Sequence, residues 1–242
     1  MNINSIKTHK IQYGDLLETV LNSYIVTLPE RSVIAVTSKI ISVIEGRYVD
    51  KKDTDIKQLI QQEADQILKT DKSLHNIYLT IKNGLLIPSA GIDESNVDDV
   101  YVLYPHDVWK TAEWIWQYLR AKHQIKELGV IITDSHTTIM RRGVTGIALS
   151  WCGFSPLYSY IGKLDLYGQP LKVTQINIVD SLAVAAVFVM GEGCEQTPMA
   201  TITQAPHLTF VNRPPIKEER ANMIISLEED LYAPLLRSSQ WE

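Results

Sequence analysis

The run Val130–Thr133, which leads directly into Asp134, constrains the fold more than any other stretch of the sequence. A short apolar run bounded by polar residues is typical of a strand buried inside a sheet. Arg141 and Arg142 follow shortly after the carboxylate, and a second apolar run begins after Gly143. The pattern therefore predicts a buried strand whose polar end carries charged groups of both signs.

Other segments alternate between strand and helix patterns without a regular order. Strands are predicted at 32–38, 85–93, 100–105, 171–179 and 200–204. Helices are predicted at 16–26 with Asp15 as the cap, 54–70 with Asp53 or Thr54, 107–122 with Asp107, 181–190 with Asp180, and near 218–232. This irregular alternation favours an α+β or mixed α/β fold over a regular doubly wound sheet. No domain boundary is visible, so we expect one unit over residues 1–242.

Two of the predicted helices are expected to be buried. The helix at 107–122 carries an apolar stripe that we expect to face inward, formed by Val108, Ala112, Ile115 and Leu119. Its tryptophans are expected to pack against other side chains rather than form a binding platform: Trp109, Trp114 and Trp116. The segment 181–190 is too apolar to face water, which predicts a buried helix that ends at Gly191.

The composition excludes several classes of protein. The chain has 242 residues, 45% of them hydrophobic, with a net charge of -5, so a broad basic surface for nucleic acid is not expected. The two cysteines, Cys152 and Cys194, form no C-x-x-C pair, which argues against a zinc site or a disulfide scaffold. The start of the chain resembles no secretory signal, and the longest apolar run is far shorter than the ~20 residues of a membrane helix. A cytoplasmic protein is the expectation.

Three loops carry small, polar or charged residues where an apolar element ends. They are the segments 89–96, 133–136 (leading to Arg141, Arg142 and Gly143) and 190–193. Carboxylates such as Asp93 and Asp134 suit Mg²⁺ or Mn²⁺, and Ser135 can add a hydroxyl ligand. Glycines let the backbone approach a metal or phosphate, and arginines match phosphate oxygens. The loops therefore predict a metal and phosphate site.

Each of these residues also has an ordinary structural interpretation. An aspartate after a strand is commonly a turn former or a helix cap, and paired arginines are commonly solvated or salt-bridged. His136 is expected at the surface, and nothing in the sequence marks Cys194 as activated.

The familiar nucleotide-binding and hydrolase motifs are absent from the sequence. There is no P-loop, no G-x-S-x-G and no H-E-x-x-H. Gly191 and Gly193 begin like a dinucleotide fingerprint, but Gln196 stands at the third glycine position. A nucleotide, if bound, must be held by some other fold.

Taken in order, seven segments resemble the coenzyme F-420 γ-glutamyl ligase family, and the resemblance runs from about Gly14 to Pro198. The matching stretches are 37–39 with 45–47, 90–97, 130–135, 141–148, 165–168, Asp180 and 190–193. No single stretch is decisive, but seven in sequence make a chance similarity improbable. The resemblance is to the bacterial branch, whose members have been linked to folate metabolism.

The resemblance implies a two-lobed α+β fold that dimerises, with a nucleotide in a groove near the dimer interface. It implies a GTP-dependent ligase that uses Mn²⁺ or Mg²⁺ and L-glutamate. By position, the implied metal ligands are Asp93, Asp134, Ser135 and the Gly191 carbonyl. The implied nucleotide contacts are the segment 8–11, Ser38, Lys39, Asn96 and the loop 189–196, which includes Val189, Met190, Gly191, Glu192 and Gly193.

Two departures from the family pattern bear on the acceptor. The family commonly continues with Gly-Arg-Pro after the position of His136, but this chain has Thr137–Ile139 there. Val43 also replaces a lysine that is frequent two residues before Glu-Gly-Arg. The acceptor is expected to be folate-like or a deazaflavin, with folate preferred, and Arg141 or Arg142 is expected to hold a phosphate or a substrate carboxylate.

Two other function classes remain open from the sequence. The chain could be a nucleotide- or ligand-binding protein that lost turnover together with the missing arginine. It could also be a metal-dependent phosphohydrolase that uses the same carboxylates.

Overall fold

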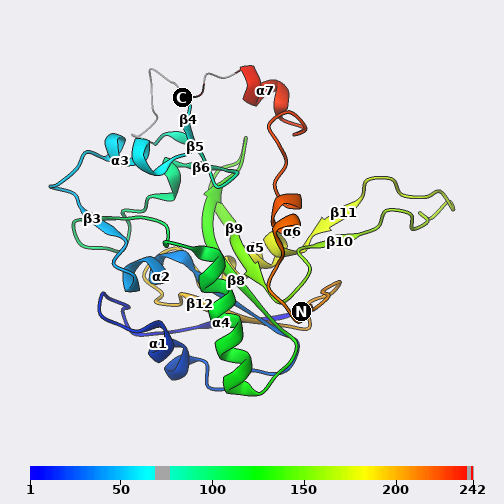
Figure 1. Ribbon diagram of the computed structural model, residues 1–242, viewed down its shortest axis with the longest axis horizontal. Coiled ribbons are helices and arrows are strands. Elements are labelled where there is room, and N and C mark those ends of the chain that lie inside the picture. Colours follow the sequence, from blue (N-terminus) through cyan, green and yellow to red (C-terminus); the bar gives the residue numbers. More distant parts are fainter. Residues whose placement is uncertain (69–76, 239–240, 242) are drawn as a thin grey trace.

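The computed structural model describes residues 1–68, 77–238 and 241 (Figure 1). Its core is a five-stranded sheet with the order β1-β12-β2-β8-β9, in which β2 and β8 run parallel and the other neighbours antiparallel. The strands are β1 (Asn2–Ile6), β2 (Ser32–Thr37), β8 (Leu128–Thr137), β9 (Val144–Cys152) and β12 (Met199–Thr203). The mixture of helices with mixed and antiparallel sheets confirms the predicted α+β class.

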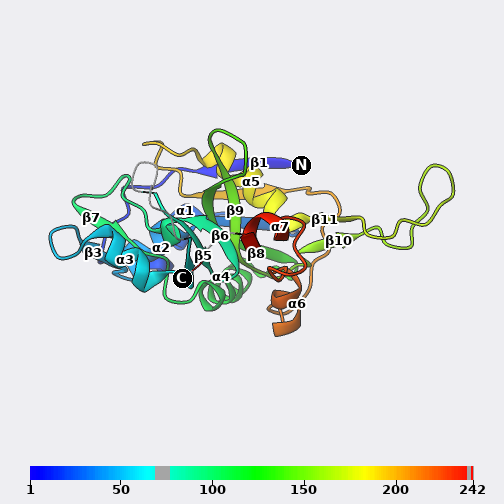
Figure 2. The same cartoon turned by 90° about the horizontal axis from the view of Figure 1, so that it is seen from above.

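Helices cover both faces of the central sheet, which explains the uninterrupted apolar runs. On β2, Ile34 and Val36 pack into one core, whereas Val33 and Ala35 pack into another. Successive side chains of a strand point to opposite faces, so a strand covered on both sides must be apolar throughout. The first core receives α1 (Leu17–Tyr24), α2 (Ser38–Ile44) and α4 (Val108–His123), and the second receives α5 (Ile178–Met190). Figure 2 shows α5 and α4 on opposite sides of the sheet.

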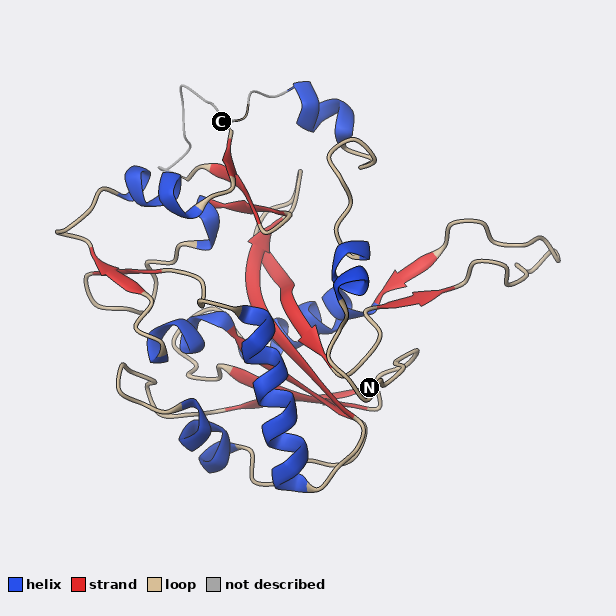
Figure 3. Cartoon of the chain, in the orientation of Figure 1, coloured by secondary structure: helices blue, strands red, loops and turns tan. Residues whose placement is uncertain are grey.

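The part of the chain that joins α2 to α4 forms a smaller region of short helices and strands. It contains β3 (Tyr48–Asp50), α3 (Ile56–Glu63), β4 (Gln66–Ile67), β5 (Leu79–Lys82), β6 (Leu85–Pro88), the short helix η1 (Ser89–Gly91) and β7 (Val100–Val102). The strands form two small sheets, β3-β7 and β4-β5-β6. Figure 3 shows the outer half of the long β8–β9 hairpin reaching up to this region. The region therefore lies beside the polar end of β8.

Two further parts extend from the core. The antiparallel pair β10 (Leu157–Ser159) and β11 (Gln175–Asn177) forms the base of a long arm that projects away from the body (Figure 1). The C-terminal part carries α6 (Lys217–Asn222) and α7 (Ala233–Ser238). Among the described residues, no helix is long and apolar enough to cross a membrane.

Helix α4 confirms the prediction for 107–122. The Asp107 carboxylate accepts hydrogen bonds from the backbone N–H groups of Trp109 and Lys110 at 3.1 and 3.0 Å, so it caps the helix as expected. The stripe formed by Ala112, Ile115 and Leu119 is fully buried, and Val108 is half-buried. Trp109 and Trp116 pack inside as predicted, whereas Trp114 is partly exposed and stacks on Tyr118.

The structure corrects two predicted helices in the first part of the chain. Asp15 does not cap α1; its carboxylate accepts from the Gln12 backbone N–H at 2.8 Å and closes the preceding turn. The helix predicted at 54–70 is only α3, and its cap is Asp55 rather than Asp53 or Thr54. The chain then becomes extended and pairs as β4, and the last two residues of the predicted helix lie outside the described residues.

The second half of the chain holds three more corrections. The strand predicted at 171–179 is only β11, because α5 already begins at Ile178. Asn177 caps α5, and Asp180 lies inside its first turn. The helix predicted at 218–232 is replaced by the short α6, a non-helical stretch and α7.

Helix α5 is also less buried than its composition predicts. Most of one side packs under the sheet, but Phe188 is 87% exposed and Val184 is 41% exposed. A chain that leaves such residues in water exposes an apolar face, which natural monomers tend to avoid.

Candidate active site

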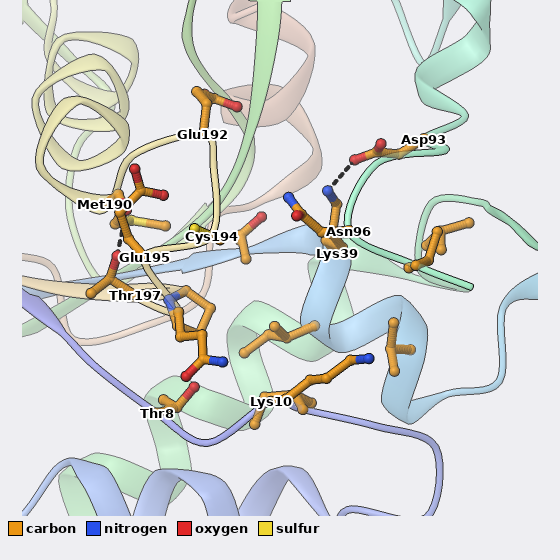
Figure 4. A pocket seen from close by; sticks show the side chains of 18 of the residues that line it. Thr8, Lys10, Lys39, Asp93, Asn96, Met190, Glu192, Cys194, Glu195 and Thr197 are labelled. Carbon is orange, nitrogen blue, oxygen red and sulfur yellow. Dashed lines mark hydrogen bonds and ion pairs between the residues drawn. The ribbon is translucent and has the colours of Figure 1, made fainter. Parts of the chain in front are cut away.

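A cavity of about 710 Å³ opens beside the polar ends of β2 and β8 (Figure 4). Its walls include residues from five parts of the chain. They are the segment 8–13, the start of α2, the loop after η1, the polar part of β8 and the loop after α5. Segments far apart in the sequence thus meet around one hollow, as binding sites commonly require.

The loop that carries Asp93 owes its shape to the turn η1. Ser89, Ala90 and Gly91 have φ values of 48°, 54° and 72°, three consecutive residues in the left-handed region. The ring of Tyr104 lies against Gly91 so closely that a Cβ there would be 2.1 Å from the ring, which only glycine permits. Asp93 then pairs with Val102 through two backbone hydrogen bonds of 2.9 and 2.8 Å. The turn and this pairing fix the backbone from which the Asp93 side chain enters the cavity.

Lys39, near the start of α2, forms an ion pair with Asp93 in the cavity wall. Its ammonium lies 2.5 Å from the Asp93 carboxylate and 2.9 Å from the Ser95 hydroxyl (Figure 4). Burial alone would raise the pKa of Asp93, but Lys39 and the hydrogen bonds from Ser95 outweigh it and hold that pKa below its usual range. Asp93 is therefore an anion at neutral pH.

Asp134 lies within β8 rather than at its end, which corrects the sequence prediction. The strand continues to Thr137 because β9 pairs with it from Val130 to its end, with a register shift after Ile132. Tyr104 donates a hydrogen bond of 2.6 Å to the carboxylate. Burial raises the pKa of Asp134 to about 6, and the nearby charge of Asp93 adds to the increase. Two carboxylates that share one cavity in this way favour a cation between them.

The loop after α5 forms the facing wall. The helix ends at Gly191, whose φ is 79°, and Asn96 donates a hydrogen bond of 3.1 Å to the Gly193 carbonyl. Burial raises the pKa of Glu192, and the charges of Asp93 and Glu195 add to the increase, while a hydrogen bond with Ser135 and the charge of Lys39 act in the opposite direction. Glu192 is thus a third acidic group that responds to the same charges.

Most residues assigned from the sequence line this cavity. They are the segment 8–11, Lys39, Asp93, Asn96, Asp134, Ser135, Met190, Gly191, Glu192, Gly193 and the rest of the loop to Gln196. Ser38 and Val189 are not among the lining residues. Cys194 is exposed at the cavity and, within the described part of the chain, forms no disulfide.

The two arginines lie elsewhere. Arg141 and Arg142 are exposed in the turn that joins β8 to β9, and neither lines the cavity. Asp180 is likewise outside, because its carboxylate accepts from the Ala148 backbone N–H at 2.9 Å. The arginines are close to Asp134 in sequence but not in space. The β8–β9 hairpin places them at its turn, beyond the end of β8.

Tyr104 is the residue of the site that the sequence did not reveal. It lies after β7, is only 6% exposed, and reaches Asp134 from a segment 30 residues earlier in the chain. From the sequence it was visible only as an aromatic residue near the end of the strand predicted at 100–105, directly before a proline, and that pattern does not distinguish it from a core aromatic residue.

The oxygen atoms of the site suit a hard divalent cation. Among residues 1–68, 77–238 and 241, no group of three or more His, Cys, Asp and Glu side chains converges enough to hold a metal unaided. Mg²⁺ and Mn²⁺ are, however, commonly bound by one or two carboxylates with substrate phosphates completing the shell. Asp93 and Asp134, with Ser135 and Gly191 lining the same cavity, fit that arrangement.

Comparison with known proteins places these features in a family. Residues 5–204 match the family model described as F420-0:Gamma-glutamyl ligase. A Methanocaldococcus jannaschii protein named coenzyme F420:L-glutamate ligase is 31% identical over 85% of this chain and 86% of its own length. Proteins of the same name from Methanococcus maripaludis and Methanopyrus kandleri are each 32% identical, over 76% and 78% of this chain and 80% and 81% of their own lengths.

Proposed function

The chain belongs to the F420-0:Gamma-glutamyl ligase family and is a γ-glutamyl ligase, and we propose that it uses GTP and a divalent metal ion to join L-glutamate to a folate-like or deazaflavin acceptor. The observation that carries the proposal is the single cavity lined by Asp93, Asp134 and the loop after α5. It supports the proposal because phosphoryl transfer needs a charged metal site and a nucleotide pocket side by side.

The proposed reaction has two steps. A carboxylate oxygen of the acceptor attacks the γ-phosphorus of GTP, which forms an acyl phosphate and releases GDP. The amino group of glutamate then attacks the activated carbonyl carbon, the new amide bond forms, a proton leaves the nitrogen, and inorganic phosphate departs. Overall, one GTP is consumed for each glutamate that is added.

The residues of the cavity are assigned roles by their chemistry. Asp93 and Asp134 would hold the metal, together with Ser135 and the Gly191 carbonyl, and a bound metal would neutralise phosphate charge. Lys39 would offer its ammonium to a phosphate, since it already lies at the edge of the carboxylate pair. Asn96, which lies beside Lys39 in Figure 4, and the backbone of residues 190–196 would hold the nucleotide, because both line the same cavity.

One incubation tests the reaction type. The chain is mixed with GTP, Mn²⁺, L-glutamate and candidate acceptors, and the products are read by mass spectrometry. An acceptor that gains one glutamate residue, with stoichiometric phosphate, supports the ligase. Phosphate release without such a gain would indicate a phosphohydrolase instead. If neither product forms, the chain is a protein that only binds nucleotide.

We further propose that the preferred acceptor is of the folate type. Thr137, the last residue of β8, and Thr138, which follows it, replace the Gly-Arg of the family pattern, three and four residues beyond Asp134. An acceptor whose carboxylate lies at Asp134 can extend along this strand. A deazaflavin precursor carries a phosphodiester that an arginine there could bind, whereas a folate monoglutamate does not.

The acceptor preference is tested by direct competition. With tetrahydrofolate monoglutamate and the deazaflavin precursor at equal concentration, we expect incorporation into folate to exceed the other by about tenfold, the effect of one charge-assisted contact. Thr138→Arg is the matched control and should raise incorporation into the phosphodiester acceptor. A dominant deazaflavin product in the wild type would refute the folate assignment.

A homodimer is also proposed, on the basis of exposed apolar surface. Among the tryptophans of α4, only Trp114 is exposed, so they offer little of this surface. The arm carries Leu166 and Tyr167, which are 100% and 89% exposed, and α5 carries Phe188. Burial of such residues against a second copy would remove them from water.

We expect light scattering at micromolar concentration to give about twice the 27.4 kDa of one chain. Phe188→Lys should shift the protein toward the monomer, because it puts a charge into the proposed contact. A wild-type mass of one chain would contradict the proposal.

A further inference from the structure

Residues 102–104 contact both aspartates of the site. Val102 holds the backbone of Asp93 through the two hydrogen bonds described above, and the Tyr104 hydroxyl holds the side chain of Asp134 at 2.6 Å. The same tripeptide therefore spans the distance between the two proposed metal ligands. Any shift of this segment changes one carboxylate relative to the other.

Arg47 anchors the segment 102–104. The Arg47 carbonyl accepts a hydrogen bond of 3.0 Å from the Leu103 N–H, and its Nε donates one of 3.0 Å to the Tyr104 carbonyl. Arg47 thus forms hydrogen bonds with two successive residues of the tripeptide, one through its backbone and one through its side chain. These two hydrogen bonds fix the backbone from which the Tyr104 side chain reaches Asp134.

Arg47 is in turn held by a largely buried ionic cluster. Its Nη2 lies 3.2 Å from both carboxylate oxygens of Glu63, and Lys82 donates to Glu63 at 2.6 Å. The Lys82 ammonium also lies 5.6 Å from the centre of the Tyr104 ring, a favourable cation–π distance. The ring also packs against Gly91. The ring of Tyr104 therefore contacts groups from β5 and η1, while its hydroxyl reaches β8.

We infer that Tyr104 is a positioning residue that fixes Asp134 relative to Asp93 and so sets the affinity of the site for its metal. The inference rests on the proposed function, because it assumes that the two carboxylates bind a divalent cation. Groups that orient a metal ligand from behind typically contribute ten- to hundredfold in metal affinity or activity. Tyr104 does not line the cavity, so its effect must pass through Asp134.

Tyr104→Phe tests the inference, because it keeps the ring and its contacts with Gly91 and Lys82 and removes only the hydroxyl. Mn²⁺ binding to the chain is measured by titration calorimetry without GTP or acceptor, so that the readout does not depend on turnover. We expect about tenfold weaker Mn²⁺ binding. Activity at low Mn²⁺ should fall with it and recover when Mn²⁺ is raised, which a loss of folded protein would not do.

Tyr101→Phe is the matched control. It removes a hydroxyl three residues away that forms no hydrogen bond within the described residues, and it should bind Mn²⁺ like the wild type. Arg47→Lys provides a second variant, since a lysine can keep a charge beside Glu63 but lacks the Nε that donates to Tyr104. It should weaken Mn²⁺ binding in the same direction by a smaller factor.

The outcomes separate this inference from the proposed function. If the wild type binds Mn²⁺ and Tyr104→Phe binds it equally well, the positioning role is refuted while the ligase proposal stands. If the wild type binds no Mn²⁺ either alone or with GTP, the metal-dependent reaction is refuted and the positioning role falls with it. Weaker binding in Tyr104→Phe with unchanged Tyr101→Phe supports the inference.

Discussion

Asp93→Asn and Asp134→Asn are each expected to leave less than about one-hundredth of the wild-type rate of glutamate incorporation. Each substitution removes one negative charge from the pair that would hold the metal, while the side chain keeps nearly the same size. Removing a residue that only supports a metal ligand already costs ten- to hundredfold, so losing a ligand should cost at least as much. The rate is measured at saturating GTP and acceptor over a range of Mn²⁺ concentrations.

The controls for these variants address folding and charge. Asparagine at 134 can still accept the hydrogen bond from Tyr104, so the far-ultraviolet circular dichroism and the cooperativity of unfolding should match the wild type. Asp53→Asn removes the same charge from an exposed side chain outside the cavity and should leave the rate unchanged. A near-normal rate in either site variant would remove that aspartate from the metal site.

The parts of the fold that were predictable are those with strong local patterns. β2 and the first half of β8 are continuous apolar runs, and such runs need burial on both faces. α4 combines a helical stripe with an aspartate cap, and both features are local. Pattern and environment agree in these elements, so the sequence alone sufficed.

The failures arise where pairing decides the structure. The apolar spacing after α3 is compatible with a helix, but β4 instead pairs with β5. No local sequence pattern predicts this pairing. β8 continues through Asp134 because β9 supplies hydrogen bonds to its polar half. Phe188 was expected to be buried because α5 is apolar all round, but such a composition does not tell which side of the helix packs on the sheet and which stays exposed.

The site was predictable only as a set of loops. Asp93, Asp134 and the loop after α5 were recognised because their residue types suit metal and phosphate, and the cavity brings them together. Arg141 and Arg142 were grouped with them by nearness in sequence, but the hairpin separates them from the cavity. Tyr104 was missed because its partner is distant in sequence, and nothing local distinguishes it from an aromatic residue of the core.

Glu63→Gln is expected to destabilise the fold by about 3 kcal/mol. Glu63 is the only carboxylate among the described residues that forms an ion pair with Arg47 or Lys82, and all three side chains are largely buried. Breaking a buried ion pair by removing one partner typically costs 3–5 kcal/mol, because the other charge is left without compensation. The lower end applies here, since the cluster keeps some contact with water. Urea unfolding at pH 7.5 measures the change.

Glu127→Gln is the matched control for this effect. Its ion pair with Arg31, at 2.6 Å, is shorter than the Arg47–Glu63 contact, yet both of its side chains are well exposed. Exposed pairs typically contribute ~0–1 kcal/mol, so the change should be far smaller than for Glu63. Equal effects of the two substitutions would show that burial of the cluster does not govern its energy.

The pH dependence of the Glu63→Gln effect provides an independent check. Burial acts to raise the pKa of Glu63, but Lys82 and Arg47 together outweigh it, so the pKa lies below its usual range in the folded chain. A lowered pKa means that the ionised group stabilises the fold above the ordinary glutamate pKa, about 4.3, and that this stability is lost as the pH falls through the folded-state value. The stability difference between wild type and variant should therefore be largest near neutral pH and shrink below about pH 4. A difference that stays constant down to pH 3 would mean that the lost stability comes from packing rather than from the charge of Glu63.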